Sequence, residues 1–160
     1  MRQQFQRFAM RIAIGRLLGL MVCVALGVGC SSKPPLVAVK GTVKLDGKAV
    51  AHAHVCFWPE EEGGDPVKKG YGMSITDENG RFVIKDMYGT EGLFPGKYKV
   101  TFSLYVDSKG NPIPPNSKAN EVYGGAKDIM PKDLQDPRTT PERAEVPRGG
   151  LEKDFDLSSR

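Results

Sequence analysis

Apolar and polar residues alternate along most of the chain, and a period of two predicts β-strands rather than helices. In residues 36–45, for example, Val39 and Val43 fall on one side, whereas Lys40 and Lys44 fall on the other. Similar runs occupy residues 53–58, 71–76, 82–84, 97–104 and 151–157. Turn sequences rich in Gly, Asp and Asn separate most of these runs. The pattern therefore predicts an all-β protein, a seven-stranded antiparallel β-sandwich.

The alternation also predicts which side chains form the core, because alternate residues of a strand point to opposite faces. The side expected to face inward comprises Val37, Val39, Val43, Leu45, Ala53, Val55, Phe57, Tyr71, Met73, Ile75, Phe82, Ile84, Tyr98, Val100, Phe102, Leu104, Leu151, Phe155 and Leu157. Residues 107–140 show no clear strand pattern and many Pro and Gly residues. We expect a long loop there, which is functional, loosely ordered or packed across an edge of the sandwich.

Residues 1–29 differ from the rest of the chain in charge and hydropathy. Their only charged residues are four arginines, and 17–28 is an uncharged run of 12 residues. A helix of that length reaches about 18 Å, which is short of a hydrocarbon core of about 30 Å. A basic start, a short apolar helix and small residues are typical of a secretory signal peptide. The alternative is an uncleaved anchor that extends back through Ile12 and Ile14.

Residues 27–32, Gly-Val-Gly-Cys-Ser-Ser, resemble a bacterial lipobox. The resemblance implies that Cys30 becomes the first mature residue and carries acyl chains such as palmitate. Gly27 stands where a lipobox prefers Leu, and Leu26 lies one place earlier. Each buried methylene contributes about 0.8 kcal/mol, so several chains would hold the protein firmly in a membrane. The alternative is ordinary signal cleavage that leaves Cys30 free.

This division predicts a signal peptide at 1–29, a Pro-rich tether at 30–35 and one domain at 36–160. Of the 23 basic residues four lie in the signal, which leaves 19 against 19 acidic residues in the remainder. The mature part is therefore neutral, and we expect no nucleic-acid partner. The expected partners are membrane lipid, through acylated Cys30, and an envelope protein or a glycan. The expected location is the exported side of the cell envelope, with inner or outer membrane left open.

His52, His54 and Cys56 are the sharpest candidate site, because they alternate along one predicted strand. Side chains two residues apart lie about 7 Å apart on one face, so neighbouring ones could share a soft metal ion. The chain contains no other His to complete a coordination sphere, and packing beside Trp58 is the alternative. Trp58 is also a candidate for stacking against a sugar ring. With no metal cofactor expected, we keep these residues as candidates only.

Catalysis is not expected from this sequence. It lacks the Gly-x-Ser-x-Gly motif of hydrolases and a Gly-rich phosphate loop before a helix. Both histidines belong to the same predicted strand. With Cys23 in the signal and Cys30 acylated, Cys56 is expected to be a free thiol. We therefore expect a protein that is not an enzyme and has no cofactor.

Three motifs together resemble the carboxypeptidase regulatory-like, or transthyretin-like, domain family. The motifs are Gly41–Val50 with Ala53–Phe57, then Thr76–Phe82, then Pro95–Val100. Segments 136–140 and 155–157 are similar to the tails of short bacterial lipoproteins that carry this domain. The resemblance implies a transthyretin-like sandwich of immunoglobulin-like Greek-key type, without catalysis and often involved in adhesion or assembly. We therefore expect a non-catalytic exported lipoprotein that binds or supports envelope components. The alternatives are a carbohydrate-binding domain and a metal-handling protein.

Overall fold

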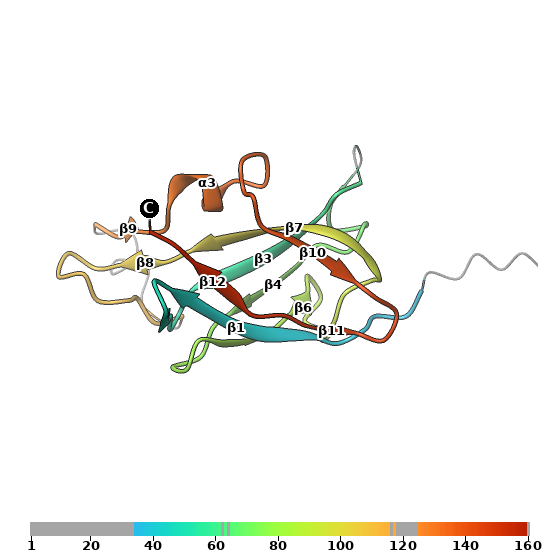
Figure 1. Ribbon diagram of the computed structural model, residues 1–160, viewed down its shortest axis with the longest axis horizontal. Coiled ribbons are helices and arrows are strands. Elements are labelled where there is room, and N and C mark those ends of the chain that lie inside the picture. Colours follow the sequence, from blue (N-terminus) through green and yellow to red (C-terminus); the bar gives the residue numbers. More distant parts are fainter. Residues whose placement is uncertain (1–33, 62, 64, 116, 118–124, 160) are drawn as a thin grey trace, which may run out of the picture. The chain divides into compact units, whose positions relative to one another are not determined.

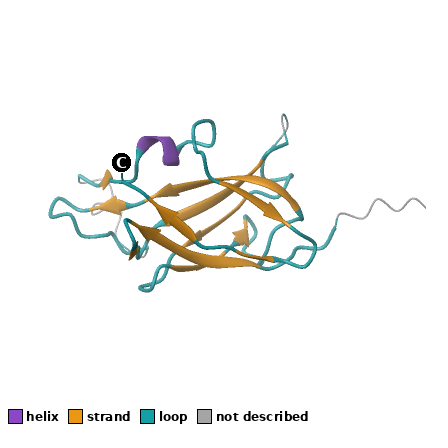
Figure 2. Cartoon of the chain, in the orientation of Figure 1, coloured by secondary structure: helices purple, strands orange, loops and turns teal. Residues whose placement is uncertain are grey.

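The computed structural model describes residues 34–61, 63, 65–115, 117 and 125–159. The predicted signal peptide, Cys30 and most of the predicted tether lie outside this part of the chain. Within it the protein is nearly all β, as predicted (Figures 1 and 2). The elements are β1 Val39–Leu45, β2 Lys48–Ala49, β3 His54–Pro59, β4 Gly72–Ile75, β5 Arg81–Val83, β6 Lys85–Asp86, β7 Gly96–Ser103, β8 Tyr105–Val106, β9 Lys127–Asp128, α3 Lys132–Gln135, β10 Arg143–Val146, β11 Leu151–Glu152 and β12 Phe155–Leu157. No helix among the described residues is long and apolar enough to cross a membrane.

Two main sheets form the sandwich (Figure 1). One of them, which we call the second sheet, has the strand order β10-β7-β3-β4-β6, and all its neighbouring strands are antiparallel. The first sheet is built around β1, with β2 and β5 antiparallel along one edge. Along the other edge β11 and β12 run parallel to β1, with Val39 opposite Leu151 and Val43 opposite Phe155. The predicted all-β sandwich with antiparallel sheets is confirmed, but the described part of the chain has more strands than the predicted seven. The C-terminal segment also pairs parallel to β1, because alternation sets faces but not strand direction.

The core lies between the inner faces of the two sheets and matches most of the predicted inward set. Phe57 of β3 and Val100 of β7 are fully buried, as are Val43 of β1 and Val55 of β3. Phe155 of β12 lies at the centre of an aromatic cluster, with ring centroids 5.0 Å from Phe102, 6.1 Å from Phe82 and 6.3 Å from Phe57. Tilted and edge-to-face ring pairs at these distances are favourable. The C-terminal strand therefore closes the core.

Strand β4 is inverted relative to the prediction. Its register places Met73 opposite Cys56 and Ile75 opposite His54, so both side chains point away from the core. Gly72 faces inward instead, and a Cβ atom there would lie 2.5 Å from Leu93 Cδ2. The interior is already filled at this point, so the small residue must face in and the large ones must face out.

The break between β11 and β12 also has a steric cause. The carbonyl oxygen of Lys153 occupies the space that a Cβ atom of Gly41 would need, so only glycine fits there. Asp154 then turns its carboxylate toward β1, where Oδ1 accepts hydrogen bonds from the Thr42 backbone N–H (2.9 Å) and hydroxyl (2.7 Å). These bonds lower the pKa of Asp154.

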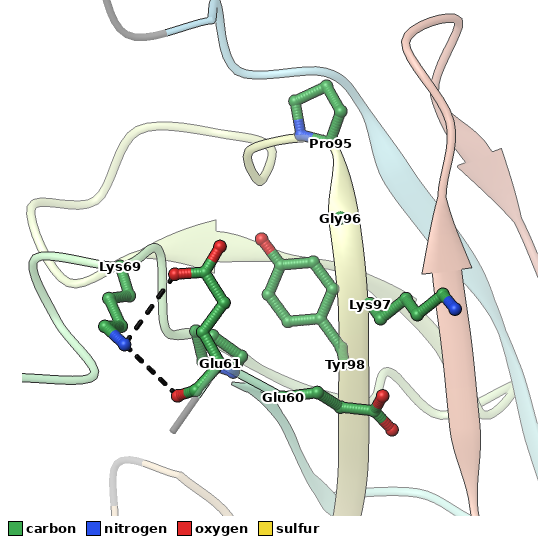
Figure 3. Close-up of a pocket in the computed structure, with 8 residues that line it drawn as sticks. Glu60, Glu61, Lys69, Pro95, Gly96, Lys97 and Tyr98 are labelled. Atoms are coloured by element: carbon green, nitrogen blue, oxygen red, sulfur yellow. Dashed lines mark hydrogen bonds and ion pairs between the residues drawn. The ribbon is translucent and has the colours of Figure 1, made fainter. Parts of the chain in front are cut away.

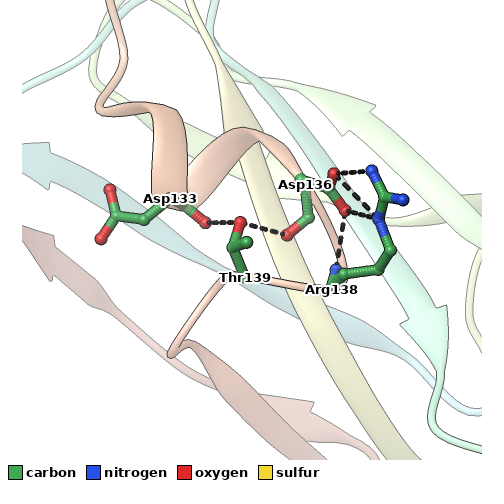
Figure 4. A network of polar contacts seen from close by, with 4 residues as sticks. All are labelled: Asp133, Asp136, Arg138 and Thr139. Carbon is green, nitrogen blue, oxygen red and sulfur yellow. Dashed lines mark hydrogen bonds and ion pairs between the residues drawn. The ribbon is translucent and has the colours of Figure 1, made fainter.

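The described parts of the segment 107–140 contain more regular structure than the predicted loop. It contains β9 and the short helix α3, and it buries the side chains of Met130 and Leu134. After α3, Asp136 forms an ion pair with Arg138, while the Thr139 hydroxyl donates to the Asp133 carbonyl at 3.0 Å (Figure 4). The hydrogen bonds from Arg138 lower the pKa of Asp136 to about 2. Residues 118–124 lie outside the described part of the chain.

Candidate functional site

The most unusual surface is the face of the second sheet that points away from the core. We call it the β3–β4 face, and it comprises His54, Cys56, Trp58, Tyr71, Met73, Ile75, Lys99, Thr101 and Ser103. An outward sheet face that meets water is normally polar. Here its middle is aromatic and aliphatic, and its side chains are half-buried except for Thr101, which is buried. The face therefore combines apolar area with access to solvent.

Trp58 and Tyr71 form the aromatic part of the β3–β4 face. Their ring centroids lie 4.5 Å apart with planes inclined at 56°. The indole Nε1–H of Trp58 donates to Thr101 Oγ1 at 2.9 Å, which holds the ring against the neighbouring strand β7. Trp58 was predicted as a candidate contact, but Tyr71 was expected in the core. The inversion of β4 brings the two rings together. This inversion follows from the filled space around Gly72, which the alternation of residue types does not show.

Cys56 lies in the middle of the same face, opposite Met73 on one side and Thr101 on the other. It is a free cysteine, as expected. Burial raises the pKa of the thiol, and contacts with the hydroxyls of Tyr71 and Thr101 offset this effect only in part. Burial and the contact with Cys56 likewise raise the pKa of Tyr71. The thiol is therefore protonated near neutral pH and is not an activated nucleophile.

The two histidines do not share a strand, contrary to the prediction. His52 has φ of 60° and lies in the turn before β3, whose first residue is His54. His52 Nε2 pairs with Glu78 Oε1 at 3.2 Å, at an open hollow of about 610 Å³. His54 packs edge-on against Tyr105, with centroids 5.7 Å apart, and burial lowers its pKa. The predicted alternation therefore fails at His52.

The candidate ligand set of His52, His54 and Cys56 gains no support from this arrangement. Each of the three has different partners, and no group of three His, Cys, Asp or Glu side chains within the described ranges could hold a metal ion. A turn residue with positive φ points its side chain out of register with the strand that follows, which a period of two cannot show.

A cavity of about 370 Å³ lies at the end of β3, where β7 begins (Figure 3). Its lining is formed by Pro59, Glu60, Glu61, Lys69, Pro95, Gly96, Lys97 and Tyr98. Lys69 Nζ lies 3.2 Å from the Glu61 carbonyl and 3.7 Å from its carboxylate. The Tyr98 hydroxyl donates to the Phe94 carbonyl at 2.7 Å, and burial raises its pKa to about 12. Within this lining Lys69 is paired with Glu61, while Glu60 forms an ion pair with Arg143 at 2.8 Å outside it.

Comparison with known proteins does not place the chain in a family. No protein-family model matches it, and no curated protein matches it. Among solved structures, a Pseudomonas aeruginosa protein with a proposed carbohydrate-binding role is 13% identical, with 81% of this chain and 92% of that one covered and a TM-score of 0.39. A 9R-lipoxygenase from Cyanothece is 14% identical over 81% of this chain, which spans 17% of that enzyme, with a TM-score of 0.33. A chlorocatechol 1,2-dioxygenase from Pseudomonas putida is 16% identical, with 79% and 60% covered and a TM-score of 0.32. Likenesses this weak indicate no activity or ligand.

Proposed function

We propose that this protein is a non-catalytic binding module of the carboxypeptidase regulatory-like type, held by lipid on the exported side of the cell envelope. Its binding surface is the β3–β4 face. The observation that carries the proposal is the apolar, half-buried middle of that face, where Trp58, Tyr71 and Met73 replace the polar residues expected beside water. Aromatic and Met side chains in such positions are typical of interface centres.

The anchor rests on sequence and on where the domain begins. Residues 27–32 resemble a lipobox, and the first backbone pairing of the sandwich, between Val37 and Leu93, comes seven residues after Cys30. A short tether directly before the first strand suits a domain held close to a lipid surface. The protonated state of the Cys56 thiol is consistent with a role that does not involve nucleophilic catalysis.

Site-specific photocrosslinking tests the binding surface. A photoreactive phenylalanine analogue at Met73 should crosslink the chain to an envelope component in whole cells. The same analogue at Lys44, which is exposed on the outer side of β1, is the matched control and should not. Equal crosslinking at both positions, or none at Met73, would contradict the proposed surface.

Intact mass tests the anchor. Protein extracted from membranes should begin at Cys30 and carry the mass of its acyl chains, and the Cys30→Ser variant should lack them. A mass equal to that of the unmodified 160-residue chain would refute the lipid anchor. The proposed binding surface would still be tested independently by the crosslinking experiment.

A carbohydrate ligand is the second candidate, favoured by the adjacent rings of Trp58 and Tyr71 on the outer face. Aromatic faces offer flat apolar area to the C–H face of a sugar ring. Glycan-array binding should be lost in Trp58→Ala and kept in Tyr88→Ala, which removes an exposed aromatic ring that does not belong to the β3–β4 face. Binding that survives Trp58→Ala would remove this candidate.

A further inference from the structure

Three turns of the sandwich share one geometry, at 77–81, 86–90 and 107–111. In each, Oδ1 of the leading Asp accepts hydrogen bonds from the backbone N–H groups two and four residues later. For the turn at 86–90 these bonds come from Tyr88 at 2.9 Å and Thr90 at 2.8 Å. The corresponding bonds in the other turns come from Asn79 (2.8 Å), Arg81 (2.8 Å), Lys109 (2.8 Å) and Asn111 (2.9 Å).

The fourth residue of each turn is a glycine with positive φ, whose N–H donates to the carbonyl of the leading Asp. The Asp and the Gly therefore determine the turn, and the two residues between them are free to vary. In two turns these tip residues are polar: Glu78-Asn79 and Ser108-Lys109. In the third they are Met87 and Tyr88, which are 50% and 83% exposed. Nothing in the turn geometry requires apolar side chains there.

The apolar tip lies at the end of the sandwich where the chain enters. Val37 and Leu93 exchange backbone hydrogen bonds of 2.8 and 3.0 Å, and Glu91 pairs with Lys85 at the base of the 86–90 turn. By contrast, Gly80 of the first polar turn accepts a bond from Val43, near the far end of β1. The second polar turn follows β7 and β8. It lies at the same far end, because Ser103 pairs with His54 at the start of β3, and Val50, just before β3, bonds to the Val43 carbonyl.

We propose that the Met87–Tyr88 tip inserts into the headgroup region of the membrane that anchors Cys30, which rests on the lipid anchor proposed above. A tether of seven residues from Cys30 to Val37 spans at most about 25 Å. The entry end of the domain therefore stays near the lipid surface. Tyrosine is enriched at membrane interfaces, where its ring is buried and its hydroxyl stays hydrated, and the flexible Met side chain adapts to irregular apolar surroundings.

The charge at the base of the turn is compatible with this position. Lys85 Nζ and Glu91 Oε1 lie 3.9 Å apart and balance each other. The Asp86 carboxylate is occupied by the turn amides. A second point of attachment would restrict rotation of the domain about its tether and so hold the β3–β4 face at one orientation to the membrane.

Quenching of indole fluorescence by brominated lipid tests the insertion. The full chain is expressed with its signal, extracted from membranes, checked for acyl mass and reconstituted in vesicles of acyl-brominated phosphatidylcholine. Tyr88→Trp places an indole at the apolar tip, while Asn79→Trp and Lys109→Trp place it at the same position of the two polar turns. The unsubstituted chain, whose one Trp is Trp58, supplies the baseline.

For an apolar tip that reaches the boundary of the acyl chains, quenching of the added indole should be at least about twofold stronger at position 88 than at 79 or 109. An acylated chain with equal quenching at all three positions overturns the insertion and leaves the anchor intact. A chain without acyl mass overturns the anchor and the insertion together. A photoreactive group at position 88 that crosslinks to protein instead of lipid also overturns the insertion.

Discussion

Thr76→Val tests how the turn between β2 and β3 is held, because it removes one hydroxyl and keeps the side-chain shape. Thr76 is 2% exposed and lies just after β4. Its hydroxyl donates to the Val50 carbonyl at 2.6 Å and accepts from the Ala53 N–H at 2.9 Å. The substitution leaves a buried acceptor and a buried donor without these partners.

Each buried backbone group that loses its partner costs about 1–3 kcal/mol. The methyl that replaces the hydroxyl recovers part of this loss by apolar burial, so we expect the free energy of unfolding to fall by about 3 kcal/mol in total. With a urea dependence of about 2 kcal/mol per molar for a domain of this size, the midpoint should fall by about 1.5 M.

Urea unfolding of the 34–160 domain, followed by far-ultraviolet circular dichroism, measures this change. Thr42→Val is the matched control, because the Thr42 hydroxyl bonds to Asp154 at an exposed site and the backbone N–H of Thr42 keeps that carboxylate. The control should lose less than about 1 kcal/mol. Equal losses in the two variants would refute the argument that burial of the unsatisfied groups dominates.

Three further predictions follow from the same structure. Gly41→Ala should lower the free energy of unfolding several-fold more than a Gly→Ala change at an exposed site, because the new Cβ meets the Lys153 carbonyl. An unchanged thermal unfolding temperature would contradict this close approach. Burial lowers the pKa of His54 in the folded protein below the value of about 6.5 that it has in the unfolded chain. The free energy of unfolding should therefore be highest above about pH 6.5 and fall as the pH drops below that value. His54→Gln should flatten that slope in urea titrations across pH 5–8. Cys56 should react with iodoacetamide more slowly in the folded protein than in urea at pH 7, as measured by mass spectrometry of a time course. Equal or faster alkylation of the folded protein would contradict this prediction.

The alternation of residue types predicted most of the core because each strand it identified packs on one side only. Ala53, Val55 and Phe57 all have 0% exposure, as expected from a period of two. The same rule failed at β4, where both sides of the strand carry residues compatible with burial. The choice between them depended on Leu93 and Ile84, which are distant in sequence and already occupy the space above Gly72.

The candidate site was predictable only in part. Trp58 and Cys56 were identified as outward residues, and the structure places them on the outer face. The metal hypothesis assumed that His52 continues the strand, and its positive φ ends the alternation there. Tyr71 was predicted to lie in the core and was therefore missed as a surface aromatic. The signal that could have found it is Gly72, because a glycine in a strand can face a part of the core that has no room for a side chain.

By itself the sequence determined the class of fold, the position of the turns and the difference in charge between the basic segment 1–29 and the neutral remainder, because each depends on residues that are neighbours in the chain. Tertiary structure alone decided that the C-terminal strand runs parallel to β1, that β4 turns its large side chains outward, and that one apolar turn lies beside the chain entry. Each of these depends on which distant segments fill the same space, and close packing allows one arrangement where local patterning allows two.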